Sequence, residues 1–566
     1  MDNFRLVLFI TLSFIVLLMY QAWLQDYGPK PQPAPPAQDL SQVPVAPNTT
    51  TASSAPEIDK ITGTPDIPSA ALPATQGQRV LESHSRVKIQ TDVLALELDT
   101  LNGDVRQLDL SKYPVDLKEK DNLVRLMTDE MPHFFIAQSG ILPGCGSPSS
   151  PMIYQAEQNS YQLAAGADKL QVVLNWQNDA GLKISKIYTM QRGSYVIDVQ
   201  HKIENHSPDA WNGCIYALLQ RTDVVEVGHN SMVYTYLGGA VSSPTHRYEK
   251  IQFSEVKDGK VTLDKRPGWQ EGWLAMVQHY FFAAWLPESD KIFHYYTRLL
   301  SQGNRYVLGM YSEPQTIKAG GEQTFNLRLY TGPKLQNYLE GIATGLDLTV
   351  DYGWLWMIAK PLFWILEFIY KWVNNWGWAI IILTIMIKLA FFHLSATSYK
   401  SMAHMRRLQP RLESLKERYA DDKAKLNQAV MDLYRHEKVN PLGGCLPILV
   451  QIPVFIALYW VLLESIELRQ APFILWIQDL SMPDPFFVLP LIMGATMLVQ
   501  HFLNPAPIDP VQQKVMLVLP IVFTGFFAFF PAGLVLYWVV NNVLSIAQQW
   551  VITKKIAGNL SVSGHL

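Results

Sequence analysis

Residues 376–398, WGWAIIILTIMIKLAFFHLSATS, form an apolar run of transmembrane length with one positive charge, Lys388, near its middle. Roughly 16 Å of helix precedes Lys388, which is about half of a bilayer's hydrocarbon core. An ammonium group at that depth costs on the order of 2.5 to 3.5 kcal/mol on insertion scales, so its presence needs a reason. With a helical period, one face of this run carries Thr384, Lys388, Ser395 and Tyr399.

The segments that flank this run have different amphipathic patterns. Residues 351–375 place Lys360, Glu367 and Lys371 on one face and Trp and aliphatic residues around the rest, which predicts an interfacial helix lying on the membrane. A transmembrane span is the alternative, but it would place the basic segment after residue 398 on the outer side of the membrane, against the positive-inside rule. Residues 399–445 are basic, with an apolar stripe and a helix start at Asp421-Asp422, so they predict a cytosolic helical hairpin.

The C-terminal part, residues 446–553, predicts four more spans, and residues 554–566 form a short basic tail. The predicted spans lie at about 446–466, 485–502, 515–530 and 533–552. At the other end, residues 1–27 contain an apolar run without a small-residue cleavage site, which predicts an uncleaved signal anchor. With the basic hairpin inside, the chain has six spans and both termini in the cytosol.

Polar residues in these spans concentrate towards their cytosolic ends. Glu464 and Glu467 lie only at the outer margin, so no carboxylate at mid-depth is available to make Lys388 a structural ion pair. Polar groups in hydrocarbon need water or partners. We therefore predict a water-filled pocket open to the cytosol, with hydrogen bonding between helices as the alternative role for the amides. Its residues are Lys388, Thr384, Ser395, Gln451, Asn541, Asn542 and Ser545.

Outside the membrane, residues 28–78 are rich in Pro, Ala, Ser and Thr and predict an extended tether. Residues 79–340 alternate apolar and polar residues with regular turns, including Asn102-Gly103, and predict a large β-sandwich on the outer side. Trp269 and Trp273 are expected in its core, with sugar stacking as the alternative.

Composition excludes several classes of function. A chain of 566 residues is too long for a single hydrophobic core, so several domains are expected. Its net charge of −3 does not indicate nucleic-acid binding. The three cysteines have no zinc-type spacing, so no metal site is predicted. Whether Cys145 and Cys214 form a disulfide stays an open question, because the sequence does not give the distance between the two cysteines. No GxxxxGK[ST] loop is present, so no nucleotide is expected.

Three long segments carry a family resemblance: KVNPLGGCLPILVQIPVF (438–455), ELRQAPFILWIQDLS (467–481) and FPAGLVLYWVVNN (530–542). They resemble the bacterial YidC-type membrane protein insertases of the Oxa/Alb family. The anchor, tether and outer domain resemble its Gram-negative members, so the resemblance covers essentially the whole chain. Lys388 departs from the Arg usual in the family, which keeps the charge and loses the planar fork for bidentate pairing.

The resemblance implies a five-helix insertase core with a periplasmic β-sandwich, in a non-enzymatic protein of the bacterial inner membrane. Implied partners are nascent membrane proteins, the ribosome, the lipid bilayer, and the Sec translocon with its accessory subunits; no cofactor is implied. The family's hydrophobic slide for the client maps onto Thr384, Ile452, Phe455, Met493, Tyr537 and Trp538. In this mechanism a client's hydrophilic tail enters the pocket while its apolar segment lies against the slide.

Two other functions are weighed against insertion. A secondary transporter would use Lys388 as the counter-charge for an anion, but transporters usually show internal repeats and polar groups reaching both sides. An envelope sugar enzyme carried by the sandwich would need a pair of acid and base residues, and none stands out.

Overall fold

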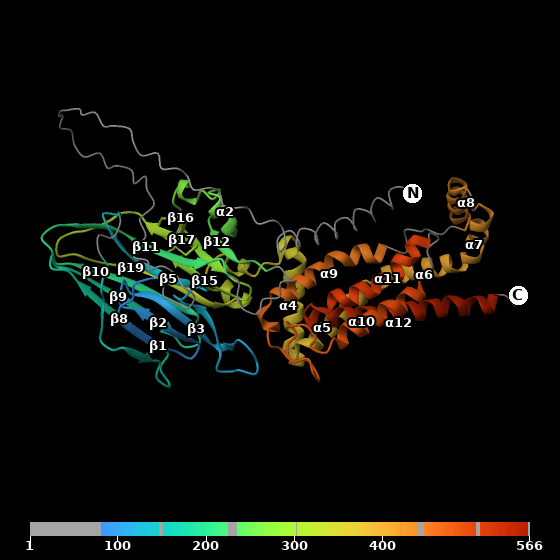
Figure 1. Ribbon diagram of the computed structural model, residues 1–566, viewed down its shortest axis with the longest axis horizontal. Coiled ribbons are helices and arrows are strands. Elements are labelled where there is room, and N and C mark those ends of the chain that lie inside the picture. The colour runs from blue at the N-terminus through green and yellow to red at the C-terminus, as the bar shows by residue number, and fades with distance from the viewer. Residues whose placement is uncertain are drawn as a thin grey trace, which may run out of the picture. The chain divides into compact units, whose positions relative to one another are not determined.

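The computed structural model describes residues 81–146, 151–224, 235–300, 303–419, 422–437, 446–504 and 510–563. The predicted anchor (1–27) and tether (28–78) lie outside these residues, as does Cys445. The described chain contains a β-sandwich followed by a helical region (Figure 1).

Two large, mainly antiparallel sheets form the sandwich. The first has the order β16 (Phe293–Leu300), β17 (Arg305–Ser312), β11 (Trp211–Thr222), β5 (Phe135–Pro143), β3 (Asp104–Pro114), β2 (Leu94–Asp99), β1 (Arg86–Gln90), β7 (Ser160–Gln162), with β18 (Gln315–Ile317) on β11 and β4 (Leu123–Met127) on β3. The second has the order β13 (Glu249–Ile251), β12 (Gly238–Ser242), β14 (Trp273–Val277), β15 (Phe281–Pro287), β19 (Glu322–Pro333), β10 (Val196–Asn205), β9 (Leu182–Gln191), β8 (Lys169–Gln177), β6 (Gln155–Ala156).

The alternating residues form the sandwich core, as predicted. Val172 and Leu174 of β8 and Val199 of β10 are fully buried. Asn102 and Gly103 both have positive φ (62° and 65°) between β2 and β3, which is the backbone of a tight hairpin turn. In alternating strands such as β8 and β10, burial of one face therefore follows from the period of two, whereas β5, β14 and β15 are buried on both faces.

Two questions left open by the sequence are answered in the sandwich. Cys145 and Cys214 form a disulfide. Trp269 stacks on Tyr295 and donates its indole N–H to the Ser242 carbonyl, while Trp273 is buried and donates to the Thr344 carbonyl. Both tryptophans are thus held by the protein itself, as core residues are.

The helices follow the sandwich along the chain, apart from two short ones within or beside it. Their bounds are α2 (Phe253–Lys257), α3 (Gln336–Glu340), α4 (Trp356–Val373), α5 (Trp376–Ala390), α6 (Phe392–Arg407), α7 (Gln409–Arg418), α8 (Lys423–His436), α9 (Leu446–Glu464), α10 (Val488–Leu503), α11 (Pro510–Phe527) and α12 (Ala532–Ser563). Short 3₁₀ turns are η1 (Leu263–Lys265), η2 (Leu346–Thr349), η3 (Gly353–Leu355) and η5 (Ile466–Leu468).

The run 376–398 is not one straight helix. It is divided at Phe391 into α5 and α6, which are bent by 67°. By length and hydropathy no single helix of the described residues qualifies as a membrane span, but this bent pair does, and shorter apolar helices cover Val450–Glu464, Val488–Leu503 and Gln513–Phe527. Helix α12 runs from Ala532 to Ser563 without an internal proline, so it continues into the residues predicted as the C-terminal tail.

Helix α4 has the amphipathic character that the sequence predicts, but its polar face contacts protein. Lys360 donates to Glu340 at 2.7 Å and to Asp347 at 3.2 Å, and Asn337 donates to Glu367 at 3.0 Å. Aliphatic residues such as Leu366 are buried in the helical core. The aromatic side chains of a third face, including Trp356, Trp364 and Trp372, are exposed.

The hairpin α7–α8 begins and packs as the sequence predicts. Asp422 accepts the backbone N–H groups of Ala424 and Lys425, which caps α8. Leu408, Leu412 and Val430 form its small apolar core. The hairpin therefore has a core of its own, separate from that of the other helices.

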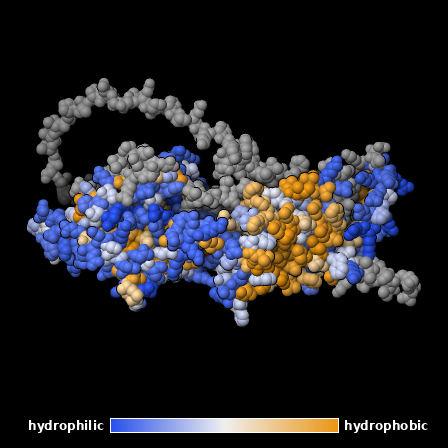
Figure 2. All heavy atoms as spheres, turned by 60° about the horizontal axis from the view of Figure 1, so that its bottom comes forward, coloured by the Kyte–Doolittle hydropathy of each residue, from blue (hydrophilic) through white to orange (hydrophobic). Residues whose placement is uncertain are grey.

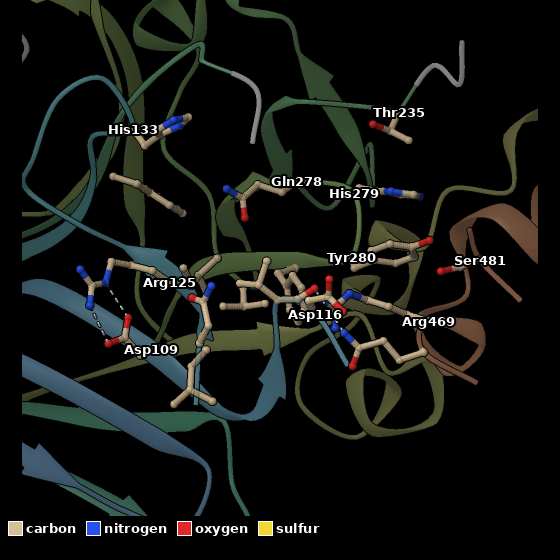
Figure 3. A pocket seen from close by; sticks show the side chains of 18 of the residues that line it. Asp109, Asp116, Arg125, His133, Thr235, Gln278, His279, Tyr280, Arg469 and Ser481 are labelled. Atoms are coloured by element: carbon tan, nitrogen blue, oxygen red, sulfur yellow. Dashed lines mark hydrogen bonds and ion pairs between the residues drawn. The ribbon is translucent and has the colours of Figure 1, made fainter. Parts of the chain in front are cut away.

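The sandwich and the helical region meet around a cavity of about 990 Å³ (Figure 3). On one side Arg125 of β4 binds the Asp109 carboxylate at 2.8 Å. On the other side Arg469 and Gln470, which follow α9, donate to the Pro114 carbonyl at 2.7 and 2.9 Å. This cavity involves none of the residues predicted to form the cytosolic pocket.

A buried ion pair also joins the two regions. Lys334, just after β19, lies 3.5 Å from Glu464 at the end of α9, and both side chains are almost completely buried. Burial lowers the pKa of Lys334, and the nearby Glu464 carboxylate opposes that lowering. Glu464, which the sequence places at an outer margin, thus has its partner in the sandwich.

We expect Lys334→Met to lower the melting temperature of the purified protein by several degrees. Removing one partner leaves Glu464 as an uncompensated buried charge, which costs about 3–5 kcal/mol. The double variant Lys334→Met/Glu464→Met should recover most of the loss, because no charge then stays buried. The control is Lys202→Met, which removes partly exposed ion pairs with Glu204 and Glu322 and should change little. Equal melting temperatures for Lys334→Met and Lys202→Met would contradict the expectation.

Candidate functional site in the helical region

The side chain of Lys388 lies inside the helical region near the end of α5. It is 8% exposed, and its Nζ donates a hydrogen bond to Ser545 Oγ of α12 at 2.8 Å. Ser545 Oγ in turn donates to the Asn541 carbonyl at 2.7 Å. Within the described part of the chain, no carboxylate pairs with Lys388. Its charge is therefore solvated by a neutral hydroxyl and is not neutralised.

The polar face predicted from the helical period stays on the inner side despite the bend at Phe391. Ser395 and Tyr399 of α6 are both buried, and Tyr399 lies against Ser545. Helices α5, α6 and α12 thus bring Lys388, Ser395, Tyr399 and Ser545 to the same part of the helical region. The bend changes the direction of α6 but leaves this face inside.

A second polar contact joins α12 to α10. Asn542 donates to Thr496 Oγ1 at 3.1 Å, and Gln549 donates to the Leu503 carbonyl at 3.2 Å and to Asn504 Oδ1 at 3.1 Å. Asn542, Ser545 and Gln549 recur at helical spacing, so one buried face of α12 supplies both polar contacts. From the sequence these residues are placed only by their depth in the last span, and the shared face is seen in the structure.

Two predicted pocket residues are not brought into these contacts. Thr384 is buried, but its hydroxyl donates to the Ile380 carbonyl of its own helix at 2.7 Å. Gln451 of α9 is partly exposed, and its Nε2 has no hydrogen-bond partner among the described residues. Asn541 is partly exposed and takes part through its backbone carbonyl.

The predicted hydrophobic slide is brought together in part. The Phe455 ring lies 4.6 Å from Trp538 and 5.9 Å from Tyr537, measured between ring centroids. Met493 is fully buried, whereas Ile452 is exposed on the outside of α9. Phenylalanines of α11 extend the aromatic cluster, since Phe527 lies 5.0 Å from Trp538.

Several members of these clusters were not predicted from the sequence, among them Thr496, Asn504, Phe523 and Phe527. Thr496 is a hydroxyl within an apolar helix, the same signal that marks Thr384, and could have been found in that way. The phenylalanines carry no such signal, because an aromatic residue within an apolar helix does not stand out from its neighbours. For metal binding, the described residues contain no group of three or more His, Cys, Asp or Glu side chains that could hold an ion.

Comparisons with known proteins cover almost the whole chain. Residues 86–365 match the family described as the YidC periplasmic domain, and residues 368–559 match the family described as the 60Kd inner membrane protein. A "Membrane protein insertase YidC" of Methylococcus capsulatus is 49% identical over 568 residues, with 99% of each chain covered. One of Thioalkalivibrio sulfidiphilus is also 49% identical, over 98% of this chain and 99% of the relative. The crystal structure described as an active YidC insertase with its first transmembrane domain resolved is 18% identical, with a TM-score of 0.38, over 84% of this chain and 94% of that one.

Proposed function

Since the chain belongs to the YidC family of membrane protein insertases, we propose that it inserts its clients by way of the polar cluster around Lys388 and the aromatic cluster around Trp538. The protein is an inner-membrane insertase with a periplasmic domain. The contacts of Lys388 are the observation that carries the proposal. A buried cation whose partner is a neutral hydroxyl keeps its charge available for a client.

In the proposed topology the chain spans the membrane six times, with both termini in the cytosol. The first span lies in the anchor, α5–α6 form a bent span, and α9 to α12 supply the others. The sandwich is then periplasmic and the hairpin α7–α8 cytosolic, in agreement with the excess of Lys and Arg over Asp and Glu in residues 399–445. Helix α4 lies on the outer membrane surface, where its exposed tryptophans fit the interface.

In the proposed mechanism a client's hydrophilic tail enters from the cytosol and meets Lys388. Its apolar segment lies against Phe455, Tyr537 and Trp538. Partition of about 20 apolar residues into lipid then draws the client away, and an acidic tail gains about 2.3 kcal/mol per charge per 100 mV. The hydroxyl groups of Ser395, Tyr399 and Ser545 near Lys388 offer the tail hydrogen-bond partners in a region where unpaired polar groups are costly.

We propose from the family alone that the protein acts either by itself or together with the Sec translocon. Contact with the ribosome is proposed on the same basis. An anion transporter is the alternative function for a buried Lys. The two are separated by reconstituting the purified protein in liposomes. We expect a small single-span client to be inserted, measured by protease protection of its tail, and no uptake of labelled anions. Anion uptake without client insertion would overturn the proposal.

A further inference from the structure

The connection between α9 and α10, residues 465–487, exposes large apolar side chains although much of its backbone is irregular. Leu475 is 74% exposed and Phe486 is 65% exposed, and Ile474, Met482 and Phe487 are also exposed. Connections at an aqueous surface are usually polar, and a group of exposed apolar residues marks contact with a membrane or another protein. This exposure therefore requires an explanation.

The backbone of the connection is bonded within the protein. Phe473 N–H donates to the Ile477 carbonyl at 3.0 Å, and Leu480 N–H donates to the Ala471 carbonyl at 3.0 Å. The Leu480 and Met482 carbonyls accept the N–H groups at the start of α12, at 2.9 and 2.8 Å. Prolines at 472, 483 and 485 have no N–H to satisfy. Irregular backbone close to hydrocarbon needs this kind of internal bonding, because lipid offers no partners.

The carboxylate of Asp484, close to Phe486 in the connection, points into the protein. Asp484 is almost completely buried and accepts the Trp476 indole N–H at 2.9 Å, the Phe486 N–H at 3.0 Å and the Leu489 N–H at 2.7 Å. These three donors stabilise its charge away from the surface. Apolar side chains are thus left on the outside of a segment that also contains a carboxylate.

The apolar side adjoins the aromatic surface at the start of α5. The Phe473 ring lies 5.7 Å from that of Trp378, which is itself exposed. The same ring packs so closely on Gly377 that a Cβ there would meet it. Asn375 donates to the Phe473 carbonyl at 3.1 Å. Apolar residues also cover much of the helical region in the view of Figure 2. The opposite side of the connection is polar and contacts the sandwich through Arg469 and Gln470.

We propose that residues 471–487 of the connection are a lipid-binding segment, with Leu475 and Phe486 inserted among the acyl chains of the outer leaflet. Arg469 and Gln470, which precede this segment, are held at the sandwich. The proposal rests on the membrane position of the helical region in the proposed function. An outer lipid surface is favoured over a protein partner because the exposed residues adjoin the aromatic surface of Trp378 and the tryptophans of α4 are exposed as well.

The test is nitroxide labelling of the full chain in nanodiscs that contain phospholipid only. Single cysteines replace Leu475 or Phe486 in a Cys445→Ser background, where Cys145 and Cys214 are paired. Ile292→Cys is the control, because Ile292 is an exposed apolar residue of the sandwich, and Trp364→Cys reports on α4. Collisions with oxygen, relative to a water-soluble nickel complex, should be several-fold more frequent at 475 and 486 than at 292. Size-exclusion chromatography confirms that each variant assembles.

The outcomes distinguish this inference from the proposed topology. If the label at 475 resembles that at 292 while the label at 364 is in lipid, the connection lies in water and the inference is overturned. A label at 475 that is shielded from both reagents would indicate protein contact and would overturn it too. If 364 and 475 are both exposed to water, the proposed membrane position of the outer side fails.

Discussion

Lys388→Glu is expected to reduce insertion of clients with acidic tails at least roughly tenfold, with a smaller effect on clients whose tails are neutral. Lys388 is buried and its hydrogen bond goes to the neutral Ser545 hydroxyl, so the substitution replaces an available cation by an anion. Two unit charges about 4 Å apart interact by about 4 kcal/mol at an effective dielectric constant of 20. A factor of ten requires about 1.4 kcal/mol, so even a strongly screened repulsion suffices.

The accompanying variants separate charge from structure. Lys388→Arg keeps the charge and should retain insertion. Lys388→Ala should be intermediate, because the hydroxyl groups of Ser395 and Ser545 still offer hydrogen bonds. Ser545→Ala is the matched control: it removes the neutral partner of Lys388 and leaves the charge, so acidic and neutral tails should respond alike. Protease protection of client tails in liposomes measures each variant. If Lys388→Glu inserts acidic tails as well as the unchanged protein does, capture by charge is wrong and Lys388 is structural.

Deleting residues 403–435 and joining the ends with a short Gly-Ser linker is expected to reduce insertion several-fold while leaving membrane assembly intact. The hairpin α7–α8 packs on its own core of Leu408, Leu412 and Val430, separate from the core of the other helices. The deletion also removes the last turn of α6, including the contact of Arg406 with the Leu503 carbonyl, but leaves the rest of α6 in place, so it should cost the other helices little stability. The loss of function follows if the hairpin's basic surface receives clients on the cytosolic side.

Assembly and function are measured separately for the hairpin deletion. The amount of protein in the membrane fraction and the protection of the sandwich from external protease report assembly, and insertion of a single-span client in liposomes reports function. Leu412→Ala with Val430→Ala loosens the hairpin without removing it and should give a partial loss. Unchanged insertion by the deletion would leave the hairpin with a role in topology alone.

Much of this protein was predictable from the sequence, because the relevant signals are local. Alternation with a period of two predicts the sandwich strands, and Asn102-Gly103 predicts the turn that joins β2 and β3. Asp422 predicts the start of α8, since a short side-chain oxygen satisfies free N–H groups at a helix N-terminus. The burial of Lys388, Ser395 and Tyr399 on one face also followed, because helical period places polar residues of an apolar helix together.

Only the tertiary structure decided which of these faces meet. The bend at Phe391 has no proline or glycine to mark it; α5 packs against α4 and α12, whereas α6 packs against α12 and α9. Lys388 finds Ser545 more than 150 positions away, and Lys334 finds Glu464 across 130 positions. A periodic pattern specifies the buried side of a helix or strand, but the partner depends on how distant segments pack, and packing is a property of the whole chain.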